Sequence, residues 1–213
     1  MSPANTKVIG ITGGIATGKS TVSRWFKKKG CPVICADSIA HDLLTTGTVS
    51  YKKTVRIFTK NILNPDKSIN RATLAQMVFT NPKQKQKLEK ILHARVRKKM
   101  RALLKEYKKK KHRLIFLDIP LLFENRLEWL CDGIICISAP QKTQIERLKN
   151  HRGQSRKHAL DRIKAQMPLR HKEKKSTFVI KNKGSMAELN NKLKDLFKKI
   201  SDTSYLTSLN ELK

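Results

Sequence analysis

One octapeptide in the chain has residue types and spacing that suit the binding of phosphate groups. A glycine, four free positions and then Gly-Lys-Ser/Thr occur together at Gly13-Gly14-Ile15-Ala16-Thr17-Gly18-Lys19-Ser20. Glycines let the backbone turn tightly enough for successive N–H groups to point inward and form a nest for an anion. Lys19 then reaches the β- and γ-phosphates of a nucleotide, and the Ser20 hydroxyl ligates Mg²⁺. The octapeptide therefore predicts nucleotide binding and phosphoryl transfer.

Two carboxylates follow strand-like segments and are candidates for the remaining chemistry. Asp37 is the first acidic residue of the chain and comes directly after the second predicted strand. Ligands bind at that edge of a parallel sheet, so Asp37 could accept the proton of an attacking hydroxyl; alternatively it caps a helix beginning at Ser38. Asp118 ends the third predicted strand and could hold Mg²⁺ through a water; alternatively it is a turn residue before Pro120.

Alternating strand-like and helical segments must position these groups. Residues 7–12 form a short β-branched run before the octapeptide, and residues 21–26 have the apolar spacing of a helix after it. Further strands are predicted at residues 32–36, 113–118, 133–138 and 178–180. Strands that alternate with helices indicate an α/β fold with a parallel five-stranded sheet, here a three-layer phosphate-loop fold.

Two long segments interrupt the strands and divide the chain into parts. We predict a nucleotide-binding core at residues 1–38, 111–140 and 176–213, a helical substrate-binding insertion at 39–110, and a lid at 141–175. Asn64-Pro65 and Asn81-Pro82 are predicted to open helices inside the insertion, because Asn caps and Pro starts helices well. The lid segment carries twelve basic residues against three acidic ones, and arginines from such segments close over nucleotides.

The charge balance is strongly basic, with 47 Lys and Arg against 16 Asp and Glu and a formal net charge of +31. Fifteen of the basic residues lie between Lys83 and Arg113, where the only acidic residues are Glu89 and Glu106. This stretch also has a helical apolar stripe, so the charges coat a packed helix. The basic face is interpreted as solvated surface, with at most nonspecific binding of nucleic acid, since aromatic residues for base stacking are few.

Composition narrows the class of protein further. The 213 residues are long enough for a sizeable core, and no apolar stretch is long enough to span a membrane. The first seven residues lack the apolar region of a signal peptide, so a cytoplasmic protein is expected. The four cysteines, at positions 31, 35, 131 and 136, have no zinc spacing and are expected to be reduced thiols. The sequence leaves the oligomeric state open.

Several blocks of residues occur in the order seen in dephospho-coenzyme A kinases. The most specific are the block Asp118-Ile119-Pro120-Leu121-Leu122-Phe123-Glu124 and the pair Ala36-Asp37 after the second predicted strand. The resemblance covers about residues 7–200 and includes the phosphate-binding octapeptide, Leu92-His93 and Phe178-Val179-Ile180. The chain thus resembles a family whose reaction is the ATP-dependent phosphorylation of the ribose 3′-hydroxyl of dephospho-coenzyme A, the last step of coenzyme A biosynthesis.

The resemblance implies roles for individual residues. Asp37 would be the catalytic base and Lys19 the catalytic phosphate clamp, with Ser20 and Asp118 at the metal. ATP would contact the following loop and lid residues: Gly14, Ile15, Ala16, Thr17, Gly18, Lys19, Ser20, Thr21, Arg147 and Arg152, with Arg156 as a further lid candidate. The acceptor would contact Thr12, Asp37, Arg71, His93 and Leu121. The implied cofactors are ATP and Mg²⁺.

The sequence departs from the family pattern at a few positions. Ala16 stands where the family often has glycine, which raises the question whether the backbone there tolerates a Cβ. His93 lacks the proline that usually follows it, so a role in filling or capping the helix is the alternative to substrate contact.

Two other functions are compatible with part of the sequence. Nucleoside-monophosphate and shikimate kinases share the loop and the layout but not the block at residues 118–124. A basic nucleic-acid-binding protein that uses ATP as a switch would account for the charge, but no nucleic-acid module is recognised.

Overall fold

The computed structural model describes residues 6–202, without the side chains of His151 and Arg152. The chain divides into two compact units. We call residues 1–34 and 107–213 the core unit and residues 35–106 the helical unit. The predicted limits of the nucleotide-binding core, the helical insertion and the lid stay predictions.

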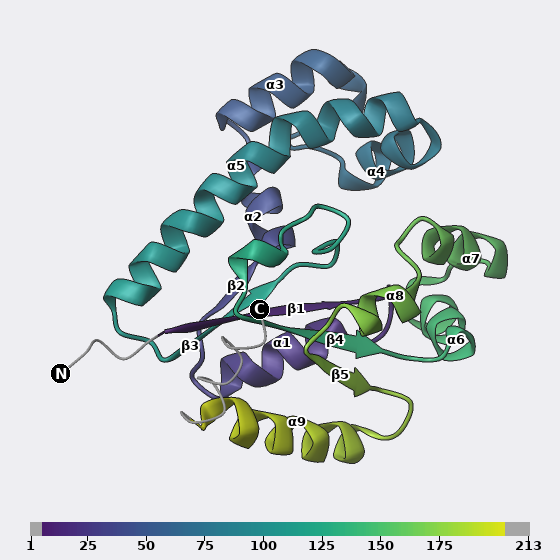
Figure 1. The fold of residues 1–213 in the computed structure, drawn as a ribbon. Coiled ribbons are helices and arrows are strands. Elements are labelled where there is room, and N and C mark those ends of the chain that lie inside the picture. The colour runs from purple at the N-terminus through teal and green to yellow at the C-terminus, as the bar shows by residue number, and fades with distance from the viewer. Residues whose placement is uncertain (1–5, 203–213) are drawn as a thin grey trace. The chain divides into compact units, whose positions relative to one another are not determined.

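A five-stranded parallel sheet forms the centre of the core unit (Figure 1). Its order is β2-β3-β1-β4-β5, and the strands are β1 (Lys7–Gly13), β2 (Val33–Cys35), β3 (Leu114–Asp118), β4 (Gly133–Ser138) and β5 (Phe178–Lys181). All five predicted strands are confirmed to within one residue at each end. The central strands β1, β3 and β4 are buried at every position, as near-continuous apolar runs in a parallel sheet require.

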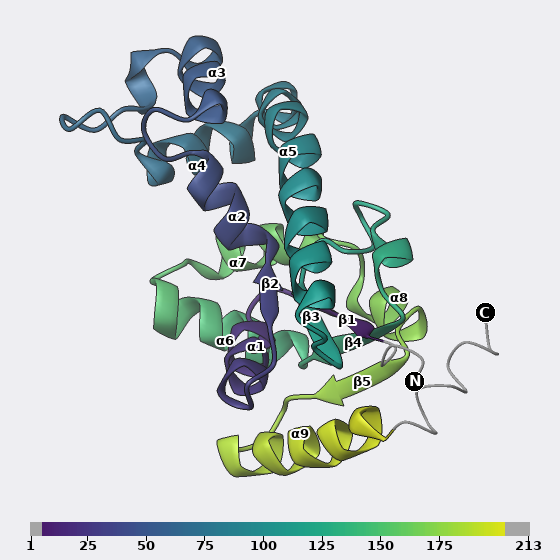
Figure 2. The same cartoon turned by 90° about the vertical axis from the view of Figure 1, so that its left-hand side faces the viewer.

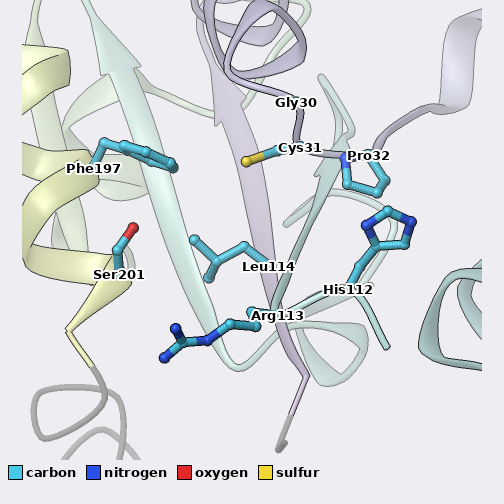
Figure 3. Close-up of a pocket in the computed structure, with 8 residues that line it drawn as sticks. All are labelled: Gly30, Cys31, Pro32, His112, Arg113, Leu114, Phe197 and Ser201. Carbon is cyan, nitrogen blue, oxygen red and sulfur yellow. The ribbon is translucent and has the colours of Figure 1, made fainter. Parts of the chain in front are cut away.

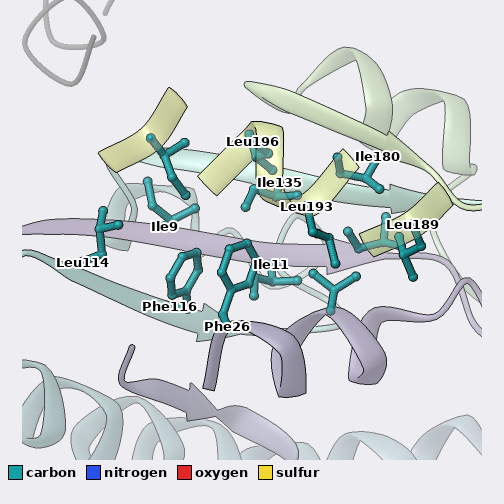
Figure 4. Packing of buried hydrophobic residues seen from close by; sticks show 13 residues of the cluster. Ile9, Ile11, Phe26, Leu114, Phe116, Ile135, Ile180, Leu189, Leu193 and Leu196 are labelled. Atoms are coloured by element: carbon teal, nitrogen blue, oxygen red, sulfur yellow. The ribbon is translucent and has the colours of Figure 1, made fainter. Parts of the chain in front are cut away.

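Two helices cover one face of the sheet. They are α1 (Lys19–Lys28) and α9 (Met186–Ser201), and α9 lies beside β5 in both views (Figure 1 and Figure 2). Leucines of α9 at positions 189, 193 and 196 recur at helical spacing and pack with Ile9, Ile11 and Ile135 of the sheet (Figure 4). Phe26 of α1 stacks on Phe116 of β3 with ring centroids 4.0 Å apart. This packing holds α1, the helix that follows the phosphate loop, against the sheet.

The segments that follow β3 and β4 complete the core unit. A 3₁₀ turn, η2 (Glu128–Leu130), precedes β4. The predicted lid segment forms α6 (Gln141–Arg152), α7 (Arg156–Lys164) and α8 (Leu169–Lys174). Helix α6 packs on α7, and α8 packs on β1 and β4. This part of the chain therefore rests against the carboxyl edge of the sheet.

The helical unit has its own small core. It consists of α2 (Ala36–Leu43), α3 (Val49–Phe58), the 3₁₀ turn η1 (Lys60–Ile62), α4 (Arg71–Thr80) and most of α5 (Pro82–Lys109). Its buried cluster is Phe58, Ile62, Ile69 and Leu74. Most of the basic stretch lies in α5, a 28-residue helix that ends at Lys109, and its apolar stripe is buried or half-buried.

One predicted helix start in this unit is confirmed and one is wrong. Asn81 Oδ1 accepts from the N–H groups of Lys83 and Gln84, so it caps α5 as predicted. Asn64 instead begins a tight turn in which its N–H donates to Ser68 O at 2.8 Å. Asn70, not Asn64, caps the next helix, because its side chain accepts from Thr73 N. Asp66 holds the turn closed by accepting from the Ser68 N–H and hydroxyl.

Candidate active site

The phosphate-binding octapeptide joins β1 to α1 at the carboxyl edge of the sheet. Strand β1 ends at Gly13, and α1 begins at Lys19, so the predicted strand, loop and helix context is present. Gly18 precedes the helix with φ 97°, a left-handed conformation that glycine adopts without strain. No side chain caps α1, so its first N–H groups and its positive dipole end are directed at the loop. This arrangement is the anion site expected at a helix N-terminus.

Ala16 also adopts a left-handed backbone, with φ 57°. Alanine can adopt this conformation at a cost of roughly 1–2 kcal/mol per residue, because its Cβ approaches the following carbonyl oxygen. The loop therefore holds a residue with a Cβ in a left-handed conformation.

Lys19 and Asp118 are brought together at the mouth of the loop. Parallel pairing places Asp118 opposite Ile11, two residues before β1 ends, so the end of β3 lies beside the loop. The Lys19 ammonium and Asp118 Oδ1 form an ion pair in which both side chains are largely buried. Ser23 Oγ donates to Asp118 Oδ2 at 2.7 Å. Each oxygen of the Asp118 carboxylate thus contacts a side chain of α1.

Four side chains from the last third of the sequence form hydrogen bonds with the loop backbone. Gln144 Nε2 donates to Ile15 O at 2.7 Å, and Gln166 Oε1 accepts from Ile15 N at 2.9 Å. Arg147 donates to Ala16 O at 3.2 Å, and the buried Asn182 donates to Thr17 O at 2.8 Å. Arg147 was predicted as an ATP contact, and the structure places it on the loop itself. Spacing does not reveal Gln144, Gln166 or Asn182, because an amide at a helix or strand end has no pattern of its own.

A cavity of about 890 Å³ lies beside these side chains, at the carboxyl ends of β4 and β5. Gln144 and Gln166 line it, together with Lys164, Lys181 and Lys183. A smaller cavity of about 230 Å³ lies where β2 and β3 begin, between Cys31, His112, Leu114 and Phe197 (Figure 3). The phosphate loop follows the opposite, carboxyl end of β1, so the smaller cavity is not the phosphate site.

The remaining predicted residues of the core unit are placed as follows. Ser20 is exposed and Thr21 half-buried in the first turn of α1. Thr12 is fully buried, and its hydroxyl donates to Pro120 O at 3.0 Å. Leu121 is half-buried, and Arg156 is exposed at the start of α7. The Arg152 side chain lies outside the part of the chain that the structure describes.

Three predicted residues belong to the helical unit. Asp37 is exposed in the first turn of α2, which begins at Ala36, so Asp37 lies inside the helix and not at its cap. Arg71 and His41 are in contact, with Arg71 Nη1 2.9 Å from His41 Nδ1. His93 is half-buried in the middle of α5. The capping alternative for Asp37 is therefore wrong, although a carboxylate in the first turn still complements the helix dipole.

Oxygen ligands for a magnesium ion are available at the loop. Ser20 supplies a hydroxyl and Asp118 a carboxylate, the hard oxygen ligands that Mg²⁺ prefers. Residues 6–202 contain no cluster of three or more His, Cys, Asp or Glu that could hold a metal alone. Phosphate oxygens and waters would therefore have to complete the coordination, as is usual for magnesium in nucleotide sites. No helix in the same range is long and apolar enough to cross a membrane.

The parallel sheet, the loop and the uncapped start of α1 define a phosphate-loop nucleotide-binding protein. Comparison with known proteins gives the family. The model of the dephospho-CoA kinase family matches residues 7–188.

Individual relatives agree with this assignment. The chain is 41% identical over 195 residues to a dephospho-CoA kinase of Lactobacillus johnsonii, covering 92% of this chain and 98% of the relative. It is 46% identical over 179 residues to one of Carboxydothermus hydrogenoformans, covering 84% and 87%. A solved dephospho-CoA kinase from Campylobacter jejuni superposes with a TM-score of 0.68 at 31% identity, covering 91% and 96%. The chain belongs to the dephospho-CoA kinase family and is an enzyme of that kind, acting in the last step of coenzyme A biosynthesis.

Proposed function

We propose that this enzyme transfers the γ-phosphate of ATP to the ribose 3′-hydroxyl of dephospho-coenzyme A, with Mg²⁺, and releases coenzyme A and ADP. The observation that supports this most directly is the phosphate loop with its Lys19–Asp118 pair, in a chain that belongs to the dephospho-CoA kinase family. Such a reaction requires little covalent chemistry from the protein. Alignment of the two substrates and neutralisation of charge on the transferred group supply most of the acceleration.

The loop would bind the triphosphate. Backbone N–H groups of the loop other than that of Ile15, which donates to Gln166, and those of the first turn of α1 would contact phosphate oxygens. Lys19 would neutralise the β- and γ-phosphates. Ser20 and Asp118 would hold Mg²⁺, which supplies further charge neutralisation on the same oxygens. Lid arginines are the natural source of additional positive charge; Arg147, Arg152 and Arg156 are the candidates.

The acceptor would be oriented and deprotonated by residues named from the family resemblance. Asp37 would accept the proton of the 3′-hydroxyl as it attacks the γ-phosphorus. Its exposure in the first turn of α2 is compatible with access to a substrate. Arg71, which contacts His41, would bind an anionic group of the coenzyme, with His93, Thr12 and Leu121 as further candidate contacts.

An acceptor screen tests the proposal. Purified protein is incubated with Mg·ATP and dephospho-coenzyme A, and with AMP or shikimate in parallel, while ADP release and the mass of the acceptor are followed. We expect a mass gain of one phosphoryl group on dephospho-coenzyme A only. Digestion of the product with a 3′-nucleotidase, which should restore the starting mass, checks the position of the phosphate. Transfer to AMP or shikimate instead would refute the proposed acceptor.

A further inference from the structure

Lys172 of α8 is the most deeply buried charged residue among those that the structure describes. Its side chain has no exposed surface, whereas lysine is almost never fully buried unless it is paired. Its ammonium lies 2.7 Å from Glu124 Oε1, and it donates to Pro120 O at 3.1 Å and to Gly13 O at 3.4 Å. None of the roles discussed above uses this residue.

The partners of Lys172 belong to the two segments that carry the catalytic loop and Asp118. Gly13 is the last residue of β1 and the first of the phosphate-binding octapeptide. Pro120 comes two residues after Asp118, and its carbonyl also accepts from the Thr12 hydroxyl at 3.0 Å. One ammonium therefore ties the start of the loop to the segment that follows β3.

Glu124 extends this connection to a third segment. Its Oε1 also accepts from Met167 N at 3.0 Å, in the connection between α7 and α8. The residue before Met167 is Gln166, which holds the Ile15 N–H of the loop. The Lys172–Glu124 pair thus joins the loop, the block at residues 118–124 and the α7–α8 connection at one buried point within the core unit.

Stability alone is a weak reason to bury such a pair. Removing two charges from water costs several kcal/mol per ion, and well-packed apolar residues are often as stable or more stable at the same place. What an ammonium supplies and an apolar side chain lacks is three directed donors, here aimed at two backbone carbonyls and a carboxylate. Directed contacts to the start of the loop and to the segment after β3 indicate that the pair fixes the relative positions of these two segments.

We propose that Lys172 is a positioning residue for phosphoryl transfer. By holding Gly13 and Pro120 to one point, it fixes the loop relative to the end of β3, so that Lys19 and Asp118 meet in the geometry that the reaction needs. The proposal rests on the kinase function above. A displacement of about 1 Å of reacting groups can cost about 10²-fold in rate, so loss of this anchor should be visible in turnover.

The test compares Lys172→Met with Lys172→Arg and with Lys174→Met, an exposed lysine of the same helix. We expect Lys172→Met to lower kcat by at least about tenfold while the KM for ATP changes much less. Lys172→Arg keeps the charge and the donors and should recover part of the loss, and Lys174→Met should behave as the wild type. Unchanged kcat in folded Lys172→Met would overturn the proposal.

A double variant separates positioning from folding. Lys172→Met alone leaves the Glu124 carboxylate without its cation and is expected to lower the melting temperature. Adding Glu124→Gln removes that charge but keeps an oxygen that can accept from Met167 N, so the melting temperature should rise again. If Lys172 positions the loop, kcat of the double variant stays low; if Lys172 only stabilises the fold, kcat recovers together with stability.

Failure of the kinase assignment would be recognised separately. Wild-type protein that releases ADP without phosphorylating dephospho-coenzyme A refutes the proposed acceptor. In that case the positioning role is tested by comparing the rate of ATP hydrolysis of each variant with that of the wild type. Equal hydrolysis by Lys172→Met and the wild type would reject it.

Discussion

Lys19, the first residue of α1, and Asp118, the last residue of β3, form an ion pair at the mouth of the phosphate loop. Ser23, one helical turn after Lys19, donates to the other oxygen of the same carboxylate at 2.7 Å. Asp118 therefore holds the ammonium of Lys19 near the loop. A phosphate group bound at the loop would give Lys19 a second anionic partner.

Lys19→Ala is expected to lower kcat/KM by at least about 10²-fold. The reason is that it removes the main positively charged side chain proposed to neutralise the transferred phosphoryl group. It should also lower stability, since Asp118 would remain buried without its cation. Turnover is measured well below the melting temperature to keep the two effects apart. Lys28→Ala, an exposed lysine in the last turn of the same helix, is the control. Near wild-type turnover by Lys19→Ala would exclude its role as the phosphate clamp.

Asp118→Asn tests the proposed magnesium site. The amide is close in shape but has no charge, so the Mg²⁺ concentration for half-maximal activity should rise and kcat should fall by about tenfold or more. Ser20→Ala should move the magnesium requirement in the same direction. The control is Asp132→Asn, whose carboxylate accepts from Val8 N at the far end of β1 and should not affect magnesium. A magnesium titration unchanged by Asp118→Asn would show that the carboxylate only supports Lys19.

Asp37→Asn is expected to lower kcat by about 10²-fold or more with little change in the KM for ATP, because it removes the proposed base for the acceptor hydroxyl and leaves the loop intact. Asp42→Asn, also exposed and on the same helix, is the matched control. Initial rates are measured over a range of both substrates. Turnover of Asp37→Asn within twofold of the wild type would refute the assignment of the base.

The strands and the loop could be predicted because their signals are local. Val8, Ile9 and Ile11 are β-branched in one short run, and the glycines and Lys19 of the loop have fixed spacing. The turn at Asn64 was mistaken for a helix start, since Asn-Pro favours both. In the structure, the bridge between Leu63 and Ile69 and the bond from Asn64 N–H to Ser68 O close the turn.

The contacts that brace the loop could not be predicted from the sequence. Lys172 lies in a segment rich in lysine, where nothing distinguishes a buried ammonium from its solvated neighbours. Gln144 and Asn182 reach the loop across more than a hundred residues of chain. Such contacts depend on how α6, α8 and β5 pack, which neither propensity nor periodicity encodes.

The conformation of the loop predicts opposite tolerances at Gly18 and Ala16. At Gly18, φ is +97°, and a Cβ would lie 2.3 Å from Nδ2 of Asn182. Asn182 is itself buried and donates to Thr17 O, so it cannot move aside freely. Gly18→Ala is therefore expected to cost about 1–3 kcal/mol of stability and most of the activity.

Ala16→Gly should change stability by less than about 1 kcal/mol. Relief of strain at φ 57° favours the variant, while the greater freedom of glycine in the unfolded chain opposes it by a similar amount. Urea denaturation of both variants measures the difference. The assigned loop conformation would be contradicted if Gly18→Ala were as stable as the wild type.

Thiol chemistry gives a prediction about the sheet itself. Burial, reinforced by the nearby Glu173 carboxylate, raises the pKa of the Cys136 thiol to about 12, and burial also raises the pKa of Cys31. A thiol with a raised pKa stays protonated, and only the thiolate is nucleophilic.

At pH 8 in native buffer, iodoacetamide should therefore leave Cys136 unmodified. In urea it should react like a free thiol, with a pKa of about 8.5. Peptide mass analysis after timed quenching identifies the modified residues. Alkylation of Cys136 at equal rates in both conditions would contradict its burial in β4, the strand on which α8 packs.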